Sequence, residues 1–252
     1  AGIYYTVGIP PVLTLTAPGS GTTLRASDPV VFEATVSDNE DPPNEVALRW
    51  ESDVDGVFST TGTDSSGAIT LTVDSLSAGD QVVTVTATDT DGLYVTETVA
   101  FNLNQPPTAP TVTLSPDPAV TTDDLVATAT DATDPDASGA VTYAYAWTED
   151  GAALSETSAT LPASATTKDR TYRVVVTPSD GTGSGPTGEA EITIDNTATV
   201  LSGPTLSSST AQVGDVLTCT ATATDADAVD TVTVTYAWSD GSTGSSYTVT
   251  PA

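Results

Sequence analysis

The sequence predicts an all-β fold in which one small β-sandwich is repeated three times in tandem. Apolar residues alternate with small or polar ones in three stretches, residues 46–50, 141–147 and 232–238. Each stretch ends in one of the three tryptophans of the chain. A period of two is typical of a strand with one face in a core. The tryptophans are spaced by roughly 90 to 100 residues, the length of one small sandwich, so we expect one tryptophan in each core.

Composition supports the same fold class. The chain is rich in Thr and Val, which favour pleated strands, and its 19 Gly and 17 Pro, with many Asp, are typical turn residues. No stretch has convincing helical periodicity. No run of about 20 apolar residues is present, so the sequence predicts no membrane span.

The first copy is expected over residues 11–105, after an orphan strand at residues 1–10. Residues 2–4 and 92–94 both read Gly, aliphatic, Tyr, and both runs lead to a Pro-Pro pair. The orphan strand is therefore either the last strand of a preceding domain or a donor strand for another molecule. The strands expected in the first copy are 12–16, 30–36, 46–50, 68–73, 81–88 and 93–103, with a turn at 53–56.

The second copy is expected over residues 106–196 and the third over residues 197–252. A Pro-rich linker at 105–110 is expected to be stiff, because proline fixes φ. The expected strands are 111–114, 125–130, 141–147, 159–162, 171–177 and 189–194, then 205–206, 216–223, 232–238 and 247–249. The third copy lacks its last two strands, which would leave an open sheet edge. Two explanations remain: a segment of a longer repeat protein, or a subunit that exchanges strands.

Residues 31–38 with Trp50, followed by residues 76–92, carry a family resemblance. They resemble the PKD and related immunoglobulin-like, or cadherin-like, tandem repeats of bacterial secreted and surface proteins. The resemblance implies three immunoglobulin-like sandwiches in a rod, the third incomplete at its C-terminus. It also implies that Cys219, on the strand expected at residues 216–223, stands where such domains carry half of a disulfide. The other half would lie on one of the last two strands, which the third copy lacks. The alternative is a small buried thiol.

The charge of the chain is strongly negative. Its 34 acidic and five basic residues give a formal net charge of −29. Such a field repels phosphates, so nucleic acid and anionic membrane surfaces are not expected as partners. The acidity is explained either by solubility outside the cell or by Ca²⁺ binding, since Ca²⁺ takes several oxygen ligands.

The candidate metal ligands lie in the loops at residues 37–43, 130–136 and 224–230, and in the later loops at residues 89–92 and 179–181. The resemblance places both sets of loops at one end of each sandwich, where a cadherin-like Ca²⁺ would stiffen the joint with the preceding domain. The spacing is not that of an EF-hand, and Asp-Gly and Asp-Pro also form ordinary turns. The candidates are Asp38, Glu40, Asp41, Asp89 and Asp91 in the first copy, Asp131, Asp134, Asp136 and Asp180 in the second, and Asp225, Asp227 and Asp230 in the third.

No enzymatic activity is expected. The sequence contains no His, which excludes Ser-His-Asp and Cys-His arrangements within it. Acids on the loops of narrow sandwiches offer no cleft for a glycosidase pair. No Gly-rich phosphate loop lies between a strand and a helix.

The sequence therefore predicts a non-enzymatic extracellular structural protein. It would be a rod-like repeat segment of a cell-surface adhesin or a subunit of an extracellular fibre, with Ca²⁺ at the domain junctions. The expected partners are neighbouring copies of the chain or further repeats, with surface glycans or another cell-surface protein as alternatives. The alternative function is an accessory spacer or carbohydrate-binding region of a secreted hydrolase. Burial of the tryptophans would disfavour carbohydrate binding, which usually needs exposed aromatic residues.

Overall fold

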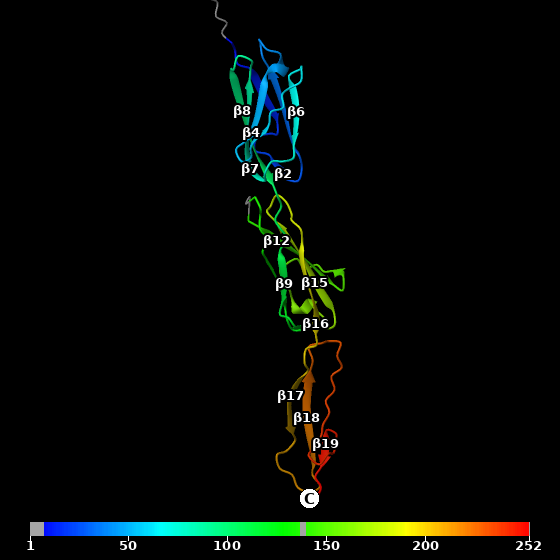
Figure 1. Ribbon diagram of the computed structural model, residues 1–252. Helices are drawn as coiled ribbons and strands as arrows, with labels where there is room; N and C mark the ends of the chain where they lie inside the picture. The colour runs from blue at the N-terminus through cyan, green and yellow to red at the C-terminus, as the bar shows by residue number, and fades with distance from the viewer. Residues whose placement is uncertain (1–7, 137–139, 252) are drawn as a thin grey trace, which may run out of the picture. The chain divides into compact units, whose positions relative to one another are not determined.

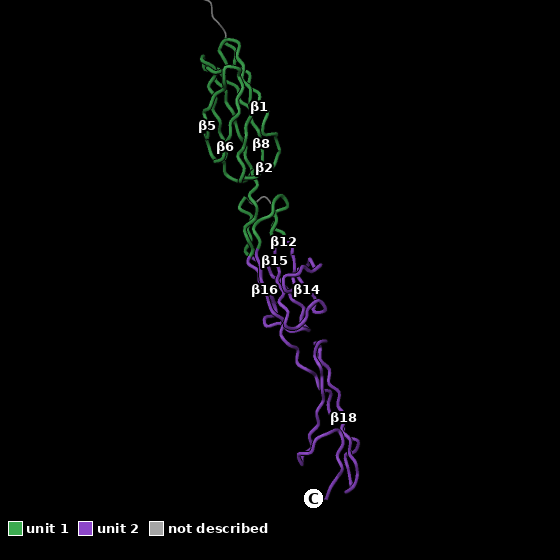
Figure 2. The backbone as a smooth tube through the Cα atoms, turned by 90° about the vertical axis from the view of Figure 1, so that its right-hand side faces the viewer, with its two compact units in different colours: residues 1–110, 131–143, 177–187 green, residues 111–130, 144–176, 188–252 purple. Residues whose placement is uncertain are grey.

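The computed structural model describes residues 8–136 and 140–251 and is all-β, as the sequence predicts (Figure 1). The helical segments of the described residues are two 3-10 turns, η1 (Pro43–Glu45) and η2 (Ala163–Ala165). By its contacts the chain divides into two compact units (Figure 2). The first comprises residues 1–110, 131–143 and 177–187, and the second comprises residues 111–130, 144–176 and 188–252.

The first unit contains a complete sandwich of two sheets. One sheet has the order β1-β3-β6, with β1 (Val12–Ala17), β3 (Val30–Ser37) and β6 (Ala68–Val73). The other has the order β2-β8-β7-β4-β5, with β2 (Thr23–Arg25), β8 (Tyr94–Asn104), β7 (Gly79–Thr88), β4 (Ala47–Ser52) and β5 (Gly56–Ser59). All pairs are antiparallel except β2 with β8, which is parallel.

Alternation along β3 builds the core of this sandwich. Its residues are buried and exposed in strict turn, which places Phe32 inside and Val31 outside. The Phe32 ring lies 5.6 Å from that of Trp50 and 5.9 Å from that of Phe101. Trp50 is 0% exposed, and its indole Nε1 donates a hydrogen bond to the Thr61 carbonyl at 3.2 Å. Trp50 is therefore buried with its one polar group satisfied, as a core tryptophan requires.

The second sandwich repeats the arrangement. Its sheets have the orders β10-β16-β15-β12-β13 and β14-β11-β9. The strands are β9 (Thr111–Ser115), β10 (Ala119–Val120), β11 (Leu125–Thr130), β12 (Thr142–Glu149), β13 (Ala152–Ala153), β14 (Thr160–Leu161), β15 (Thr171–Ser179) and β16 (Gly188–Asp195). Trp147 is 1% exposed, and its Nε1 donates to the Ser158 carbonyl at 2.9 Å. The two tryptophans thus occupy equivalent positions.

The third copy differs from the expectation. It contains one sheet, β17 (Val200–Leu206), β18 (Val216–Thr224) and β19 (Ser246–Thr248), in that order. The strand expected at residues 232–238 is not formed; only Ala237 pairs, in an isolated bridge with Thr243. The expected burial of Trp238 is also wrong: its ring is partly exposed and stacks on Tyr247 at 5.1 Å.

The reason is the missing partner strand. In the first two copies the tryptophan strand pairs with a later strand, β4 with β7 and β12 with β15. Among residues 197–251 no strand takes that position. Without it residues 232–236 make no backbone ladder, and the apolar face of β17 and β18 remains open. Leu201 and Leu206 are accordingly more than half exposed.

Several smaller expectations also changed. The short strands β2, β5, β10 and β13 were not predicted, because two to four residues carry too little periodic signal. Cys219 on β18 is free and partly exposed.

Other expectations are not tested. Residues 1–7 of the expected orphan strand at residues 1–10 lie outside the described residues. The domain limits at residues 10, 105 and 196 stay predictions. Among the described residues, no helix is long and apolar enough to cross a membrane.

Replacement of Phe32 by Ala tests the core of the first sandwich. We expect the free energy of unfolding to fall by about 3–5 kcal/mol, because the substitution leaves a cavity against two other rings. Val31→Ala, on the exposed face of the same strand, is the matched control and should change it by less than about 1 kcal/mol. Urea unfolding followed by tryptophan fluorescence measures both. Equal losses in the two variants would contradict the assigned faces of β3.

Candidate cation sites in the acidic loops

The loop after β3 in the first sandwich is organised by Asp38. Its Oδ1 accepts the backbone N–H groups of Glu40 at 2.8 Å and Asp41 at 3.0 Å. Its Oδ2 is buried and accepts no hydrogen bond within the described residues. A buried carboxylate oxygen without a donor is costly, and a cation is one way to satisfy it.

The other candidates of this copy tie the two loops together. The Asp41 carboxylate accepts both the backbone N–H of Thr90, at 2.9 Å, and its hydroxyl, at 2.8 Å. Asp89 is 8% exposed and accepts the Leu93 N–H at 2.8 Å, while Glu40 Oε2 accepts the Ile9 N–H at 3.1 Å. Asp91 is exposed on the β7–β8 loop. Most of these acids therefore serve loop structure in the first place.

The candidates of the second copy hold the chain that leaves the first sandwich. Asp136 Oδ2 accepts the Gln105 N–H at 2.5 Å, and Asp134 Oδ1 accepts the Asp136 N–H at 3.3 Å. Asp131 lies in the left-handed region with φ 66°. Asp180 accepts the Asn104 side-chain amide at 3.1 Å.

Asp180 is also the centre of its own loop. Its Oδ1 accepts the backbone N–H groups of Thr182 and Gly183, both at 2.6 Å. Partial burial acts to raise the pKa of Asp180, but these donors and Asn104 outweigh it and hold the pKa below its ordinary value. The carboxylate is thus charged and fully engaged.

The candidates of the third copy are the ones the structure brings closest together. Within the described chain, Asp225, Asp227 and Asp230 form the one group of three acidic or thiol ligands whose donor atoms all lie within 4.8 Å of one another. Asp227 is 2% exposed, and the other two are partly buried. The three residues lie in the loop that follows β18. We call them the Asp225–Asp230 cluster.

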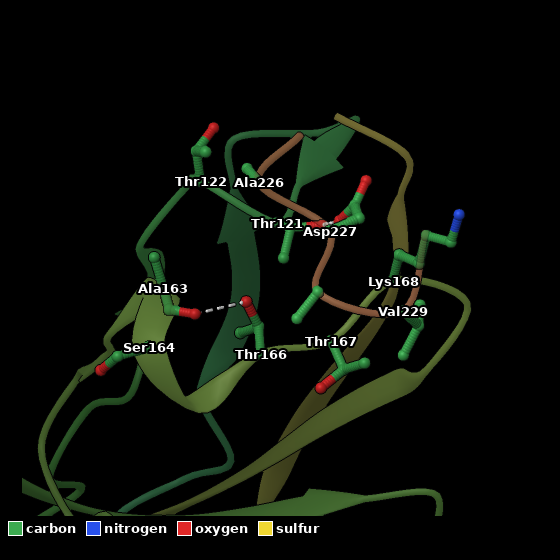
Figure 3. Close-up of a pocket in the computed structure, with 11 residues that line it drawn as sticks. Thr121, Thr122, Ala163, Ser164, Thr166, Thr167, Lys168, Ala226, Asp227 and Val229 are labelled. Atoms are coloured by element: carbon green, nitrogen blue, oxygen red, sulfur yellow. Dashed lines mark hydrogen bonds between the residues drawn. The ribbon is translucent and has the colours of Figure 1, made fainter. Parts of the chain in front are cut away.

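Hydrogen bonds from the second sandwich and the linker reach this cluster. The Thr121 hydroxyl donates to Asp227 Oδ1, a contact drawn in Figure 3, and the Thr197 N–H donates to Asp227 Oδ2 at 2.8 Å. The Thr199 hydroxyl donates to Asp225 Oδ2 at 2.5 Å, and this bond is the main reason why the pKa of Asp225 is lowered. Beside the cluster lies a cavity of about 480 Å³ lined by Thr121, Lys168 and Val229, among others (Figure 3).

Lys168 contacts the Asp225–Asp230 cluster, which the sequence alone did not indicate. Its ammonium group donates to Asp230 and, at 3.0 Å, to Asn196 Oδ1. The bond to Asp230 raises the pKa of Lys168, so the ammonium remains charged at neutral pH. Lys168 precedes β15 and is far from the cluster in sequence. Only the fold shows that the one lysine of the chain neutralises part of the negative charge of the cluster.

The Asp225–Asp230 cluster fits a hard divalent cation. Carboxylate oxygens are the ligands that Ca²⁺ prefers, and the Thr197 hydroxyl oxygen is buried without a partner next to Asp227. The Lys168 ammonium occupies Asp230, however, so a cation would have to compete with it. The donor set supports a site, and the salt bridge predicts that its affinity is limited.

Comparison with known proteins gives one family match. Residues 11–87 match the family model of a bacterial Ig domain. This stretch covers the first sandwich from β1 almost to the end of β7, and it is therefore similar to a bacterial immunoglobulin-like domain. The resemblance to PKD domains in particular is not tested by this match. No curated protein sequence matches the chain.

Solved structures match the chain at low identity. Sidekick-1 immunoglobulin domains 1–5 are 14% identical, with 86% of this chain and 46% of that chain covered and a TM-score of 0.36. A tetra-tandem repeat in the extending region of a large adhesion protein is 20% identical, with 94% and 63% covered and a TM-score of 0.30. The FN1–FN3 domains of chicken CNTN1 are 16% identical, with 75% and 67% covered and a TM-score of 0.30. The chain thus spans less than two thirds of the first two, and at these scores the likenesses carry no functional argument.

Replacement of Thr199 by Val tests the geometry of the cluster. We expect the pKa of Asp225 to rise towards its ordinary value, because the hydroxyl that stabilises the charged carboxylate is removed. A lowered pKa in the folded state means that Asp225 stabilises the fold above the ordinary carboxyl pKa and loses this effect as the pH falls.

Carboxyl ¹³C shifts followed through a pH titration measure the pKa directly. Thr222→Val, an exposed threonine on β18, is the control and should leave the Asp225 pKa unchanged. An unchanged pKa in the Thr199 variant would contradict the hydrogen bond.

Proposed function

We propose that the chain is a non-enzymatic, extracellular structural protein, a rod-like repeat segment of a cell-surface adhesin or a subunit of an extracellular fibre. The observation that carries the proposal is the way the linker is held. Two closed sandwiches follow one another, and the linker between them is hydrogen-bonded to the loops of the second. A joint fixed in this way transmits force and orientation, which a flexible tether does not.

The linker contacts lie within the first unit. Beyond the bonds of Asn104 and Gln105 described above, the Thr108 N–H donates to the Thr133 carbonyl at 2.9 Å. Gly185 packs directly on the linker: a Cβ at this position would lie 1.9 Å from the Pro107 carbonyl oxygen. Only glycine permits so close an approach of two backbones. The joint therefore depends on a specific residue and not merely on proline stiffness.

We further propose that Ca²⁺ rigidifies the junctions, chiefly at the Asp225–Asp230 cluster. The convergence of three carboxylates and the orphan oxygens of Asp38 and Thr197 support this. Neighbouring copies or further repeats are the proposed partners. The alternative function is an accessory spacer or carbohydrate-binding region of a secreted hydrolase. A spacer would also need a stiff joint. Detection of filaments assembled from the purified native protein would exclude this alternative.

Replacement of Gly185 by Val tests the held linker. The new side chain cannot fit against Pro107, so we expect the Thr108–Thr133 hydrogen bond to break while both sandwiches remain folded. The order parameter of the Thr108 amide in ¹⁵N relaxation should be about 0.85 in the unchanged chain and below about 0.6 in the variant. Gly203→Ala, where a Cβ meets nothing within 4 Å, is the control. A low order parameter already in the unchanged chain would overturn the proposed stiff joint.

Addition of Ca²⁺ tests the metal site. A ligand that binds only the folded state stabilises it, by about 2.7 kcal/mol at a concentration 100 times its Kd. We expect Ca²⁺ to raise the melting temperature, EDTA to reverse the rise, and Asp227→Asn to abolish it. Lys168→Gln should enlarge it, because the competing ammonium is gone.

The control is Asp74→Asn, which removes the same charge at an exposed position. It should respond to Ca²⁺ as the unchanged chain does. An unchanged melting temperature at millimolar Ca²⁺ would exclude a junction site of useful affinity.

A further inference from the structure

Arg25 stands apart from the other basic residues of the chain. Four of the five are in salt bridges: Arg49 with Glu51, Lys168 with Asp230, Arg170 with Asp150 and Arg173 with Glu189. The Arg25 side chain forms no salt bridge and no hydrogen bond with any described residue. In a chain with 34 acidic residues, an arginine left without a partner is unexpected. Its guanidinium is therefore available to a ligand.

The backbone around Arg25 is fixed, although its side chain is exposed. Arg25 is the last residue of β2, which pairs in parallel with the end of β8, and there it lies opposite Asn104. The Ala26 N–H donates to the Asn104 carbonyl at 2.9 Å, and the Asp28 N–H donates to the Arg25 carbonyl at 3.0 Å. The guanidinium thus projects from a rigid base, which limits the entropy lost when it binds a ligand.

Arg25 lines the largest of the cavities described for the chain, with a volume of about 610 Å³. All of its lining residues belong to the first unit: β2, the end of β8 with the start of the linker, and the loop at 179–184. A volume of this size lies within the range of small-molecule sites. The lining is mixed: Leu24 and Pro106 are apolar, and Ser27, Ser179, Thr182 and Ser184 supply hydroxyl groups. It contains no aromatic side chain, so a ligand is recognised there by charge and hydrogen bonds and not by ring stacking.

The loop that forms the far wall is held in place. Asp180 binds the N–H groups of Thr182 and Gly183, and Asn104, which is 4% exposed, donates to the same carboxylate. The Ser179 hydroxyl donates to the Gly183 carbonyl at 2.8 Å. The hydroxyls of Thr182 and Ser184 have no partner within the described chain and remain for a ligand. The wall is thus preorganised.

These features select a ligand that carries one carboxylate and several hydroxyls. A guanidinium binds a carboxylate with two parallel hydrogen bonds, and the hydroxyl side chains both donate to and accept from a polyol. A simple anion accepts hydrogen bonds from these hydroxyls but donates none to them, whereas a sugar does both. We propose that this cavity binds an acidic sugar, a hexuronic acid or the uronic residue of a saccharide. This ligand site goes beyond the structural role proposed above and does not depend on it.

The experiment follows the backbone amides of the full chain by NMR during titration with D-glucuronate. We expect glucuronate to change the shifts of Gly181, Thr182 and Gly183. D-glucose should bind the unchanged chain roughly tenfold more weakly than glucuronate does, and Arg25→Gln should bind glucuronate roughly tenfold more weakly than the unchanged chain does. In each case the charge-assisted pair is lost. Arg49→Gln, which removes an arginine of the same sheet that is already paired with Glu51, is the matched control and should bind glucuronate as the unchanged chain does.

Three results would overturn the proposal. No shift change with glucuronate would mean that the cavity takes no acidic sugar. Equal binding by Arg25→Gln would show that the guanidinium is not the anchor. Inorganic sulfate binding as tightly as glucuronate, on the same amides, would show a simple anion site without selection for a sugar.

Discussion

The pairing of the tryptophan strand with a later strand is the constraint on which this structure depends. In the first sandwich Trp50 on β4 lies opposite Val85 on β7, and both are fully buried. In the second, Trp147 on β12 is covered in the same sheet arrangement. The third copy has the same tryptophan motif, but residues 197–251 contain no such partner strand, and there the tryptophan strand itself does not form. The motif alone is therefore not sufficient for the core.

Many of the acidic side chains accept local hydrogen bonds, and a few form salt bridges with the basic residues. Asp38, Asp41 and Asp180 each accept two or more donors from their own or a neighbouring loop. At Asp180 these bonds lower the pKa, so the charged carboxylate stabilises the loop that carries it. The Asp225–Asp230 cluster is the exception, because three carboxylates lie close together and only one ammonium group, that of Lys168, forms a salt bridge with them. This excess of negative charge is the reason why we propose a cation at this cluster, whereas the hydrogen bonds of the other loops are those of ordinary turns.

Much of the fold was predictable because its main signal is a strict alternation of eight to ten residues. β3, β7 and β15 lie where the sequence places them to within two residues, and Trp50 and Trp147 are buried as expected. The strand predicted at residues 232–238 is not formed, and the reason is physical. Alternation shows which residues a strand would bury, but a strand also needs a neighbouring strand to pair with, and a local sequence pattern does not indicate whether one is present.

The site was less predictable than the fold. The sequence marks acidic loops but cannot show which carboxylates converge, since Asp225, Asp227 and Asp230 look no different from Asp131, Asp134 and Asp136. Lys168 and Arg25 were missed for the same reason: the distinction between a paired and an unpaired cation depends on neighbours far away in the chain. A search for the few basic residues of an acidic sequence would have drawn attention to both.

Amide hydrogen exchange of the full chain tests whether the tryptophan strand forms only with its partner strand, because it reports backbone pairing residue by residue. We expect strong protection of the amides of β4 that pair with β7, and exchange close to that of an unstructured peptide at residues 232–236. Protection of residues 232–236 equal to that of β4 would contradict this dependence, since the tryptophan strand would then be formed without a partner strand.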